Sequence, residues 1–202
     1  MFALIQAAGW PIWPLLLASV LALALIIERI VALRPVKVTP AGMLQRVVGE
    51  IRAQGGSDAL AENLERHSAL GKVLAAAVRN VNSSREVMKE AIEEAGRAAG
   101  HDLERYLTTL GTIASVAPLM GLFGTVVGMI EIFGATGPTG TNPQQLAHGI
   151  SVALYNTGFG LLIAIPSLIA WRHFRARVDS YLVEMEQQAV RLVEVLHGDR
   201  KA

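Results

Sequence analysis

The chain has 202 residues, of which 52% are hydrophobic and 17% are charged, and its formal net charge is +1. So high an apolar fraction is unusual for a soluble domain, whereas the near-neutral total charge says little about partners. Because the chain contains no cysteine, disulfide frameworks and thiolate metal sites are excluded.

Three apolar runs are long enough to cross a bilayer. A spanning helix needs roughly 20 residues to cross a hydrocarbon core of about 30 Å. With their flanking residues, the runs Ile12–Ile27, Thr112–Phe133 and Ile150–Trp171 reach that length. No basic residue precedes the first run and no small-residue cleavage site follows it, so we expect an uncleaved span rather than a secretory signal. The predicted transmembrane helices cover about residues 12–33, 108–134 and 148–171.

The basic residues indicate how these helices are oriented. All 18 lysines and arginines lie between Arg29 and Arg105 or from Arg172 onward. The positive-inside rule then places the N-terminus and the connector between the second and third spans outside. We therefore expect an all-α membrane protein with its N-terminus outside, its C-terminus inside and long helices that extend into the cytoplasm.

The cytoplasmic residues 34–107 have the apolar periodicity of helices that pack by one face. Ser83 and Glu86 match a capping box, and no helix breaker follows before Pro118. We therefore predict one helix of about 50 residues that runs from Ser84 into the second span and projects well below the membrane.

The third span is expected to continue beyond Trp171 as a cytoplasmic helix over about residues 172–198. Apolar residues there alternate by four and three, which is a heptad-like seam. The seam consists of Val178, Leu182, Met185, Ala189, Leu192 and Leu196. It is explained either by packing on the chain's own helices or by packing between subunits. Because no linker divides the sequence, we expect a single domain over residues 1–202.

Small and polar residues recur on one face of the second and third spans. These stripes are Pro118, Gly121, Thr125 and Gly128, and Ala153, Thr157, Gly160 and Ala164. Gly124 and Gly128 form a GxxxG pair that permits close approach of two backbones. If the stripes face a common space, Thr125, Asn156 and Thr157 supply hydroxyl and amide groups along it. The alternative is that each hydroxyl bonds to a carbonyl of its own helix.

The runs Ala117–Met129 and Gly149–Pro166 resemble the paired second- and third-span signatures of the MotA/TolQ/ExbB proton-channel family, in its ExbB/TolQ branch. The resemblance implies a homopentamer whose second and third spans surround a central pore. It further implies that the pore holds single-span helices of an ExbD/TolR-like partner, each with a membrane aspartate. Proton flow past that aspartate would energise a TonB- or TolA-like protein from the bacterial inner membrane.

The resemblance also assigns roles to residues. By position, Thr125 and Thr157 match the family's polar pore threonines, and Pro118 and Pro166 match its helix prolines, which would loosen the helices locally. Many family members carry an acidic residue five positions before the third-span threonine, where this chain has Val152. Any titrating acid at that depth would therefore come from the partner.

Two polar residues lie near the outer ends of these spans. Glu131 comes close to the end of the second span and His148 begins the third. Both are candidates for the mouth of a proton path. The alternative is that each side chain simply reaches interfacial water.

Several other functions are disfavoured by the sequence. There is no P-loop, no catalytic triad and no cluster with metal-ligand spacing, so we expect neither an enzyme nor a bound cofactor or metal. Cytoplasmic charges of both signs are interleaved, which is typical of solvated helices rather than of a nucleic-acid surface. The leading interpretation is a pore-forming subunit of a proton-driven motor surrounded by lipid. The alternatives are a non-conducting membrane scaffold and a small-solute transporter, although three spans offer no inverted repeat.

Overall fold

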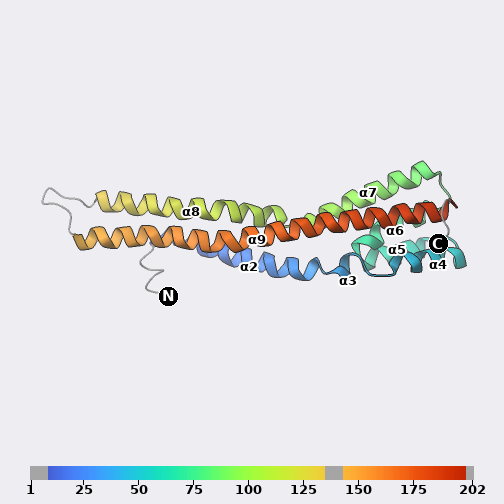
Figure 1. Ribbon diagram of the computed structural model, residues 1–202, viewed down its shortest axis with the longest axis horizontal. Coiled ribbons are helices and arrows are strands. Elements are labelled where there is room, and N and C mark those ends of the chain that lie inside the picture. Colours follow the sequence, from blue (N-terminus) through green and yellow to red (C-terminus); the bar gives the residue numbers. More distant parts are fainter. Residues whose placement is uncertain (1–8, 135–142, 199–202) are drawn as a thin grey trace. The chain divides into compact units, whose positions relative to one another are not determined.

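The computed structural model describes residues 9–134 and 143–198, and these residues form helices and their connections without a strand (Figure 1). Residues 135–142, which make up most of the connector predicted between the second and third spans, lie outside the described part, as do residues 1–8 and 199–202. The helices are α2 (Ile12–Ala32), α3 (Pro35–Val38), α4 (Met43–Gln54), α5 (Asp58–His67), α6 (Ala69–Arg79), α7 (Arg85–Glu104), α8 (Leu107–Gly134) and α9 (Pro143–Leu196).

Three helical segments, which contain α2, α8 and α9, are long and apolar enough to cross a membrane. The all-α membrane fold with three spans is therefore confirmed. The chain divides into two compact units. We call Met1–Glu28 with Tyr106–His173 the membrane unit, and Arg29–Arg105 with Phe174–Ala202 the extramembrane unit. Helix α9 begins in the first unit and ends in the second without a break over Pro143–Leu196.

The prediction of one helix from Ser84 into the second span is wrong. Helix α7 ends at Glu104 and α8 begins at Leu107. Between them Tyr106 has a φ of 65°, a left-handed conformation that residues other than glycine seldom adopt. Two segments therefore replace the single helix.

A long-range hydrogen bond stabilises the end of α7. The side chain of Arg29, only 4% exposed, donates from Nη1 to the carbonyl oxygen of Leu103 at 3.1 Å. Carbonyls in the last turn of a helix have no intrahelical partner, so a buried guanidinium there satisfies a group that would otherwise be costly to bury. The partner is distant in sequence, which is why local helix signals did not predict the break.

The extramembrane unit is assembled around the C-terminal part of α9. Val178, Met185, Ala189 and Leu192 of the predicted seam are buried within the chain, so the seam packs on the chain's own helices. The hydroxyl of Tyr181 donates to the carbonyl of Leu33 at 2.9 Å. These contacts join α9 to the segment that follows α2.

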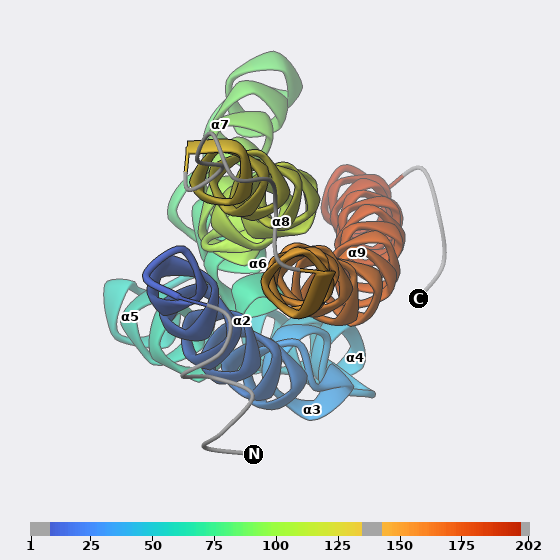
Figure 2. The same cartoon turned by 90° about the vertical axis from the view of Figure 1, so that its left-hand side faces the viewer.

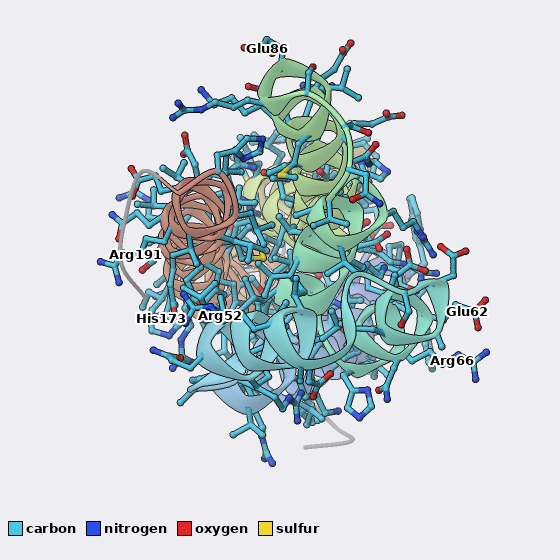
Figure 3. All side chains as sticks on the ribbon, turned by 90° about the vertical axis from the view of Figure 1, so that its right-hand side faces the viewer. Arg52, Glu62, Arg66, Glu86, His173 and Arg191 are labelled. Carbon is cyan, nitrogen blue, oxygen red and sulfur yellow. The ribbon has the colours of Figure 1, made fainter. Side chains whose placement is uncertain are left out.

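Helices α3 to α7 form the rest of this unit, and α5, α6 and α7 carry charged side chains on their outer faces. Figure 3 shows Glu62 and Arg66 of α5 projecting away from the ribbon. Nζ of Lys72 in α6 donates a hydrogen bond to Oδ2 of Asp102 in α7 at 2.6 Å. This hydrogen bond lowers the pKa of the Asp102 carboxyl. Both side chains are about half exposed, so the pair contributes at most about 1 kcal/mol to stability.

The membrane unit depends on close contact between α8 and α9. An added β-carbon at Gly124 would lie 2.6 Å from Cβ of Asn156, and one at Gly121 would lie 2.8 Å from the Asn156 carbonyl oxygen. At Gly160 it would lie 2.6 Å from the carbonyl oxygen of Ala117. No real β-carbon fits at such distances, so the two small-residue stripes face each other within one chain. Gly128 is looser, because its β-carbon would make an ordinary 3.5 Å contact with Ala153.

Helix α2 packs beside this pair, as the end-on view in Figure 2 shows. Leu15 of α2 forms a buried cluster with Ala117, Ile163 and Ala164, against which Ile113, Met120 and Phe159 are partly buried. Trp10, just before α2, meets the ring of Phe123 edge-on, with 6.0 Å between the ring centroids. The first span is thereby held against one side of the α8–α9 pair.

We expect Gly124→Leu to disrupt the α8–α9 contact and Gly158→Leu to leave it intact. The added side chain at position 124 meets the fully buried Asn156, and overpacking of this kind costs about 1–3 kcal/mol or more. At Gly158, on the same span as Asn156, an added β-carbon meets nothing within 4 Å. Thermal unfolding in one detergent measures both variants. Equal unfolding temperatures for the two would contradict the proposed tight contact.

A second matched pair tests the end of α7. Arg29→Met keeps an unbranched buried stem but removes every donor, so the Leu103 carbonyl loses its partner at a cost of about 1–3 kcal/mol. Arg34→Met makes the same chemical change at an exposed position. We expect a clear decrease in unfolding temperature for the first variant only. An unchanged unfolding temperature for Arg29→Met would show that the hydrogen bond adds nothing to stability.

Candidate functional site

The two threonines predicted to line a pore have different hydrogen bonds. Thr157 donates from Oγ1 to the carbonyl oxygen of Gly121 on α8, at 3.3 Å. Thr125 donates from Oγ1 to the carbonyl oxygen of Leu122 in its own helix, at 2.6 Å. Thr125 therefore forms the intrahelical bond of the alternative interpretation, whereas Thr157 joins the two helices; a pore-lining role for either threonine stays a prediction. Both side chains are partly exposed.

Asn156 lies inside the contact between α8 and α9. Its side chain is 0% exposed, packs against Gly124, and donates from Nδ2 to the carbonyl oxygen of Val152 at 3.2 Å. Only a glycine at position 124 leaves room for this amide. A pore-lining role for Asn156 stays a prediction.

Thr125 and Thr157 lie on the same side of the helix pair. Successive residues of an α-helix are rotated by about 100°, which places Thr125 roughly 60° from the centre of the stripe Gly121, Gly124 and Gly128. On α9, Thr157 is rotated by a similar angle, and in the same rotational direction about the helix axis, from the contacting residues Ala153, Asn156 and Gly160. Because the contacts run antiparallel, from Gly121 against Gly160 to Gly128 against Ala153, equal rotations point to one side. Most of the residues around Leu15, namely Ile113, Met120, Phe159 and Ile163, have the opposite offset, so α2 covers mainly the other side, although Ala164 in the same cluster lies only about 20° from Thr157 around α9.

The side that carries the threonines is otherwise mostly apolar and exposed, with Ser115 as a further hydroxyl nearer the start of α8. Leu122 on α8, and Leu154 and Leu161 on α9, are large exposed side chains of this face. Neither α8 over residues 107–130 nor α9 over residues 149–171 contains a charged residue. Two hydroxyls on an uncharged apolar face have the chemistry to donate to or accept from a carboxyl group that approaches from outside the chain.

The two predicted helix prolines lie within continuous helices. Pro118 is inside α8 and Pro166 is inside α9. Each lacks the N–H group that would bond the carbonyl four residues earlier, at Ala114 and Leu162, and this local weakness makes bending easier. That they flex during function stays a prediction.

Glu131 and His148 are both exposed, near the end of α8 and the start of α9 respectively. Their proposed place at the mouth of a proton path stays a prediction. Among the described residues, no group of three histidine, aspartate or glutamate side chains could hold a metal ion.

The sequence reasoning missed two glycines that extend the helix contact in both directions. An added β-carbon at Gly111 would lie 2.9 Å from Nε1 of Trp171, and one at Gly149 would overlap Ile132. Small residues spaced by three and four from Gly111 to Gly128 were the available signal. The close contact therefore extends along most of the membrane unit and fixes which side each threonine faces.

Known proteins share this sequence pattern. The model of the MotA/TolQ/ExbB proton channel family matches residues 65–187. The chain is 30% identical to biopolymer transport protein exbB1 of Vibrio cholerae, over 90% of this chain and 82% of that protein. It is 31% identical to the putative biopolymer transport protein ExbB-like 3 of Synechocystis, over 85% of this chain and 83% of that protein.

A shorter match has higher identity. The chain is 42% identical to the Tol-Pal system protein TolQ of Haemophilus influenzae, over 39% of this chain and 35% of that protein. Together with the three spans, these relatives identify a multi-pass protein of the inner membrane. On this combined ground the chain belongs to the MotA/TolQ/ExbB proton channel family, among its ExbB- and TolQ-like members.

Proposed function

We propose that the chain is the pore-forming subunit of a motor driven by the proton-motive force, which energises a TonB- or Tol-type process directed at the outer membrane. The observation that carries this proposal is the shared side of Thr125 and Thr157 on an uncharged helix pair. An ExbD/TolR-like partner helix with a membrane aspartate would lie against that side. A TonB- or TolA-like protein would receive the motion.

Threonine hydroxyls suit a carboxyl group that alternates between its charged and neutral forms. In a low-dielectric setting the charged form is costly unless donors stabilise it. A hydroxyl donates to the carboxylate and, after rotation, accepts from the protonated acid. Rotation of Thr157 away from the Gly121 carbonyl would exchange one partner for the other at little cost, because that bond is 3.3 Å long.

The proton-carrying acid must come from another chain. At the position often acidic in the family, this chain has Val152, whose carbonyl accepts a hydrogen bond from Asn156. Since residues 107–130 and 149–171 carry no ionisable carboxyl, a conducting path past the threonines requires the partner's aspartate.

A non-conducting scaffold is the second candidate function. It is favoured by the observation that both threonine hydroxyls already bond backbone carbonyls, as purely structural threonines do. Proton flux through the complex separates the two candidates, since a scaffold would assemble with its partner but conduct nothing.

We expect five copies to surround the partner helices. The apolar side of the α8–α9 pair that α2 leaves open is suited to enclose a central helix when several copies form a ring. Native mass spectrometry in mild detergent should give five times the 21.6 kDa of one chain, plus the partner where it is present. A monomeric, dimeric or tetrameric mass for the intact assembly would contradict the pentamer.

We expect Thr157→Ala to slow proton flux and Thr157→Ser to preserve most of it, because serine keeps the hydroxyl. A positioned proton-transfer group commonly contributes about a hundredfold, so the loss should be of that order. Flux is measured in liposomes that hold the chain with its partner. Loss of the bond to Gly121 alone costs about 0.5–1.5 kcal/mol, so the yield of assembled complex serves as the control.

Thr112→Ala is the matched substitution. Thr112 is exposed on α8 and donates to the Thr108 carbonyl at 2.9 Å, and the helix rotation places it away from the Thr125 side. We expect it to leave flux unchanged. Full flux through Thr157→Ala, or labelling from the lipid phase of a cysteine at position 157 in the assembled complex, would refute the role proposed for Thr157.

A further inference from the structure

Several exposed cations in the described part of the extramembrane unit form no ion pair, whereas others do, for example Arg175, which lies 3.1 Å from Glu104. Three of the cations without an ion pair, Arg34, Lys37 and Arg177, follow the first and third spans closely in sequence, and all three side chains are exposed. Unpaired exposed cations are ordinary when scattered, so their placement decides whether they have a role.

A hydrogen bond brings two of these cations to one corner of the unit. The Tyr181 hydroxyl donates to the carbonyl oxygen of Leu33 at 2.9 Å, and Arg34 is the next residue. Arg177 lies one helical turn before Tyr181 and therefore on the same face of α9. The side chains of a helix tilt toward its N-terminus, which for α9 is the direction of the span. Arg34 and Arg177 thus flank the same contact.

Helix α3 adds the third cation and an outward apolar side chain. Leu33 and Val38 are buried, whereas Val36 is 80% exposed between Arg34 and Lys37. The backbone is fixed in this arrangement by the bond from the Val38 N–H to the Arg34 carbonyl at 3.2 Å. A valine so exposed between two cations has the composition of a segment that lies at a membrane surface.

The depth of these residues fits the headgroup layer. Arg34 follows the end of α2 at Ala32 by two residues. Arg177 follows Trp171 by six residues of continuous helix, which is about 9 Å at 1.5 Å per residue. The polar layer on each side of a bilayer is about 5–8 Å thick, and a long arginine side chain that tilts back toward the span reaches it.

We propose that Arg34, Lys37 and Arg177 bind the phosphate of an anionic phospholipid of the cytoplasmic leaflet, with Val36 inserted at the boundary of the acyl chains. The site needs only the predicted inward orientation of the C-terminus and not proton conduction. A bound lipid is favoured over a soluble phosphate because an exposed valine contributes nothing to binding a small anion. It is favoured over a second copy because the exposed cations directly follow a span.

The first test compares two triple variants of the full chain in detergent micelles. The site variant carries Arg34→Gln, Lys37→Gln and Arg177→Gln. The control carries Arg46→Gln, Arg52→Gln and Arg191→Gln, which makes the same change in charge. Figure 3 shows Arg52 and Arg191 projecting from the ribbon. Native mass spectrometry measures retained phosphatidylglycerol, phosphatidylcholine and inorganic phosphate for each protein.

We expect the wild type and the control to retain phosphatidylglycerol in preference to phosphatidylcholine, and the site variant to lose this preference. At about 1 kcal/mol per cation near anionic lipid, three cations correspond to roughly a hundredfold weaker binding. Equal retention of both lipids by the wild type, unchanged preference in the site variant, or equal loss in the control would overturn the proposal. Displacement of the lipid by millimolar inorganic phosphate would show a soluble-anion site instead.

The second test locates Val36 directly. Because the chain has no cysteine, Val36→Cys and Val183→Cys each give a single site for a fluorescent label. Val183 is also exposed, at 54%, but it lies 12 residues beyond Trp171 on α9. In vesicles of phosphatidylglycerol with brominated acyl chains, we expect quenching at position 36 and none at position 183. Absence of quenching at position 36 would refute the insertion.

Discussion

The near-contact of two backbones, where α8 meets α9, is the constraint on which the membrane unit depends. Gly121, Gly124 and Gly160 leave no space for a side chain, so the helices can pack in only one rotational setting. That setting buries the amide of Asn156 and turns Thr125 and Thr157 to one side, while α2 packs on the other. A looser contact between larger side chains would allow several settings and would not fix the direction of the hydroxyls.

The same contact explains why the candidate site is incomplete within one chain. The side opposite most of α2 is largely apolar and exposed, and residues 107–130 and 149–171 contain no charged side chain. The hydroxyls of Thr125 and Thr157 donate to the carbonyls of Leu122 and Gly121. Each hydroxyl therefore has a hydrogen-bond partner in the absence of a stronger acceptor. A carboxylate is such an acceptor, because hydrogen bonds to charged groups are roughly twice as strong as those between neutral groups. The geometry is therefore one that responds to the ionisation state of an approaching acid.

Periodicity predicted the elements that depend on local pattern and failed where a distant residue decides. The spans, the unbroken passage of α9 and its buried seam follow from apolar spacing, which is a property of neighbouring residues. The break at Tyr106 does not follow from apolar spacing, because the end of α7 is stabilised by Arg29, which lies far earlier in the chain. Likewise the stripes predicted close helix contact. Sequence could not show that they contact each other, since a stripe has the same spacing whichever helix it faces.

The chain segments that pass from one unit to the other differ in whether they are continuous helix. Helices α2 and α9 pass from one unit to the other without interruption, whereas α7 and α8 are separated by a left-handed residue. A continuous helix transmits rotation and translation along its axis, because backbone hydrogen bonds connect each turn to the next. A break in the helix interrupts these hydrogen bonds. Helix α9 carries Thr157 in the membrane unit and the buried seam in the extramembrane unit. Helix α8, by contrast, carries Thr125 but begins only after the left-handed residue Tyr106, so it shares no continuous helix with α7.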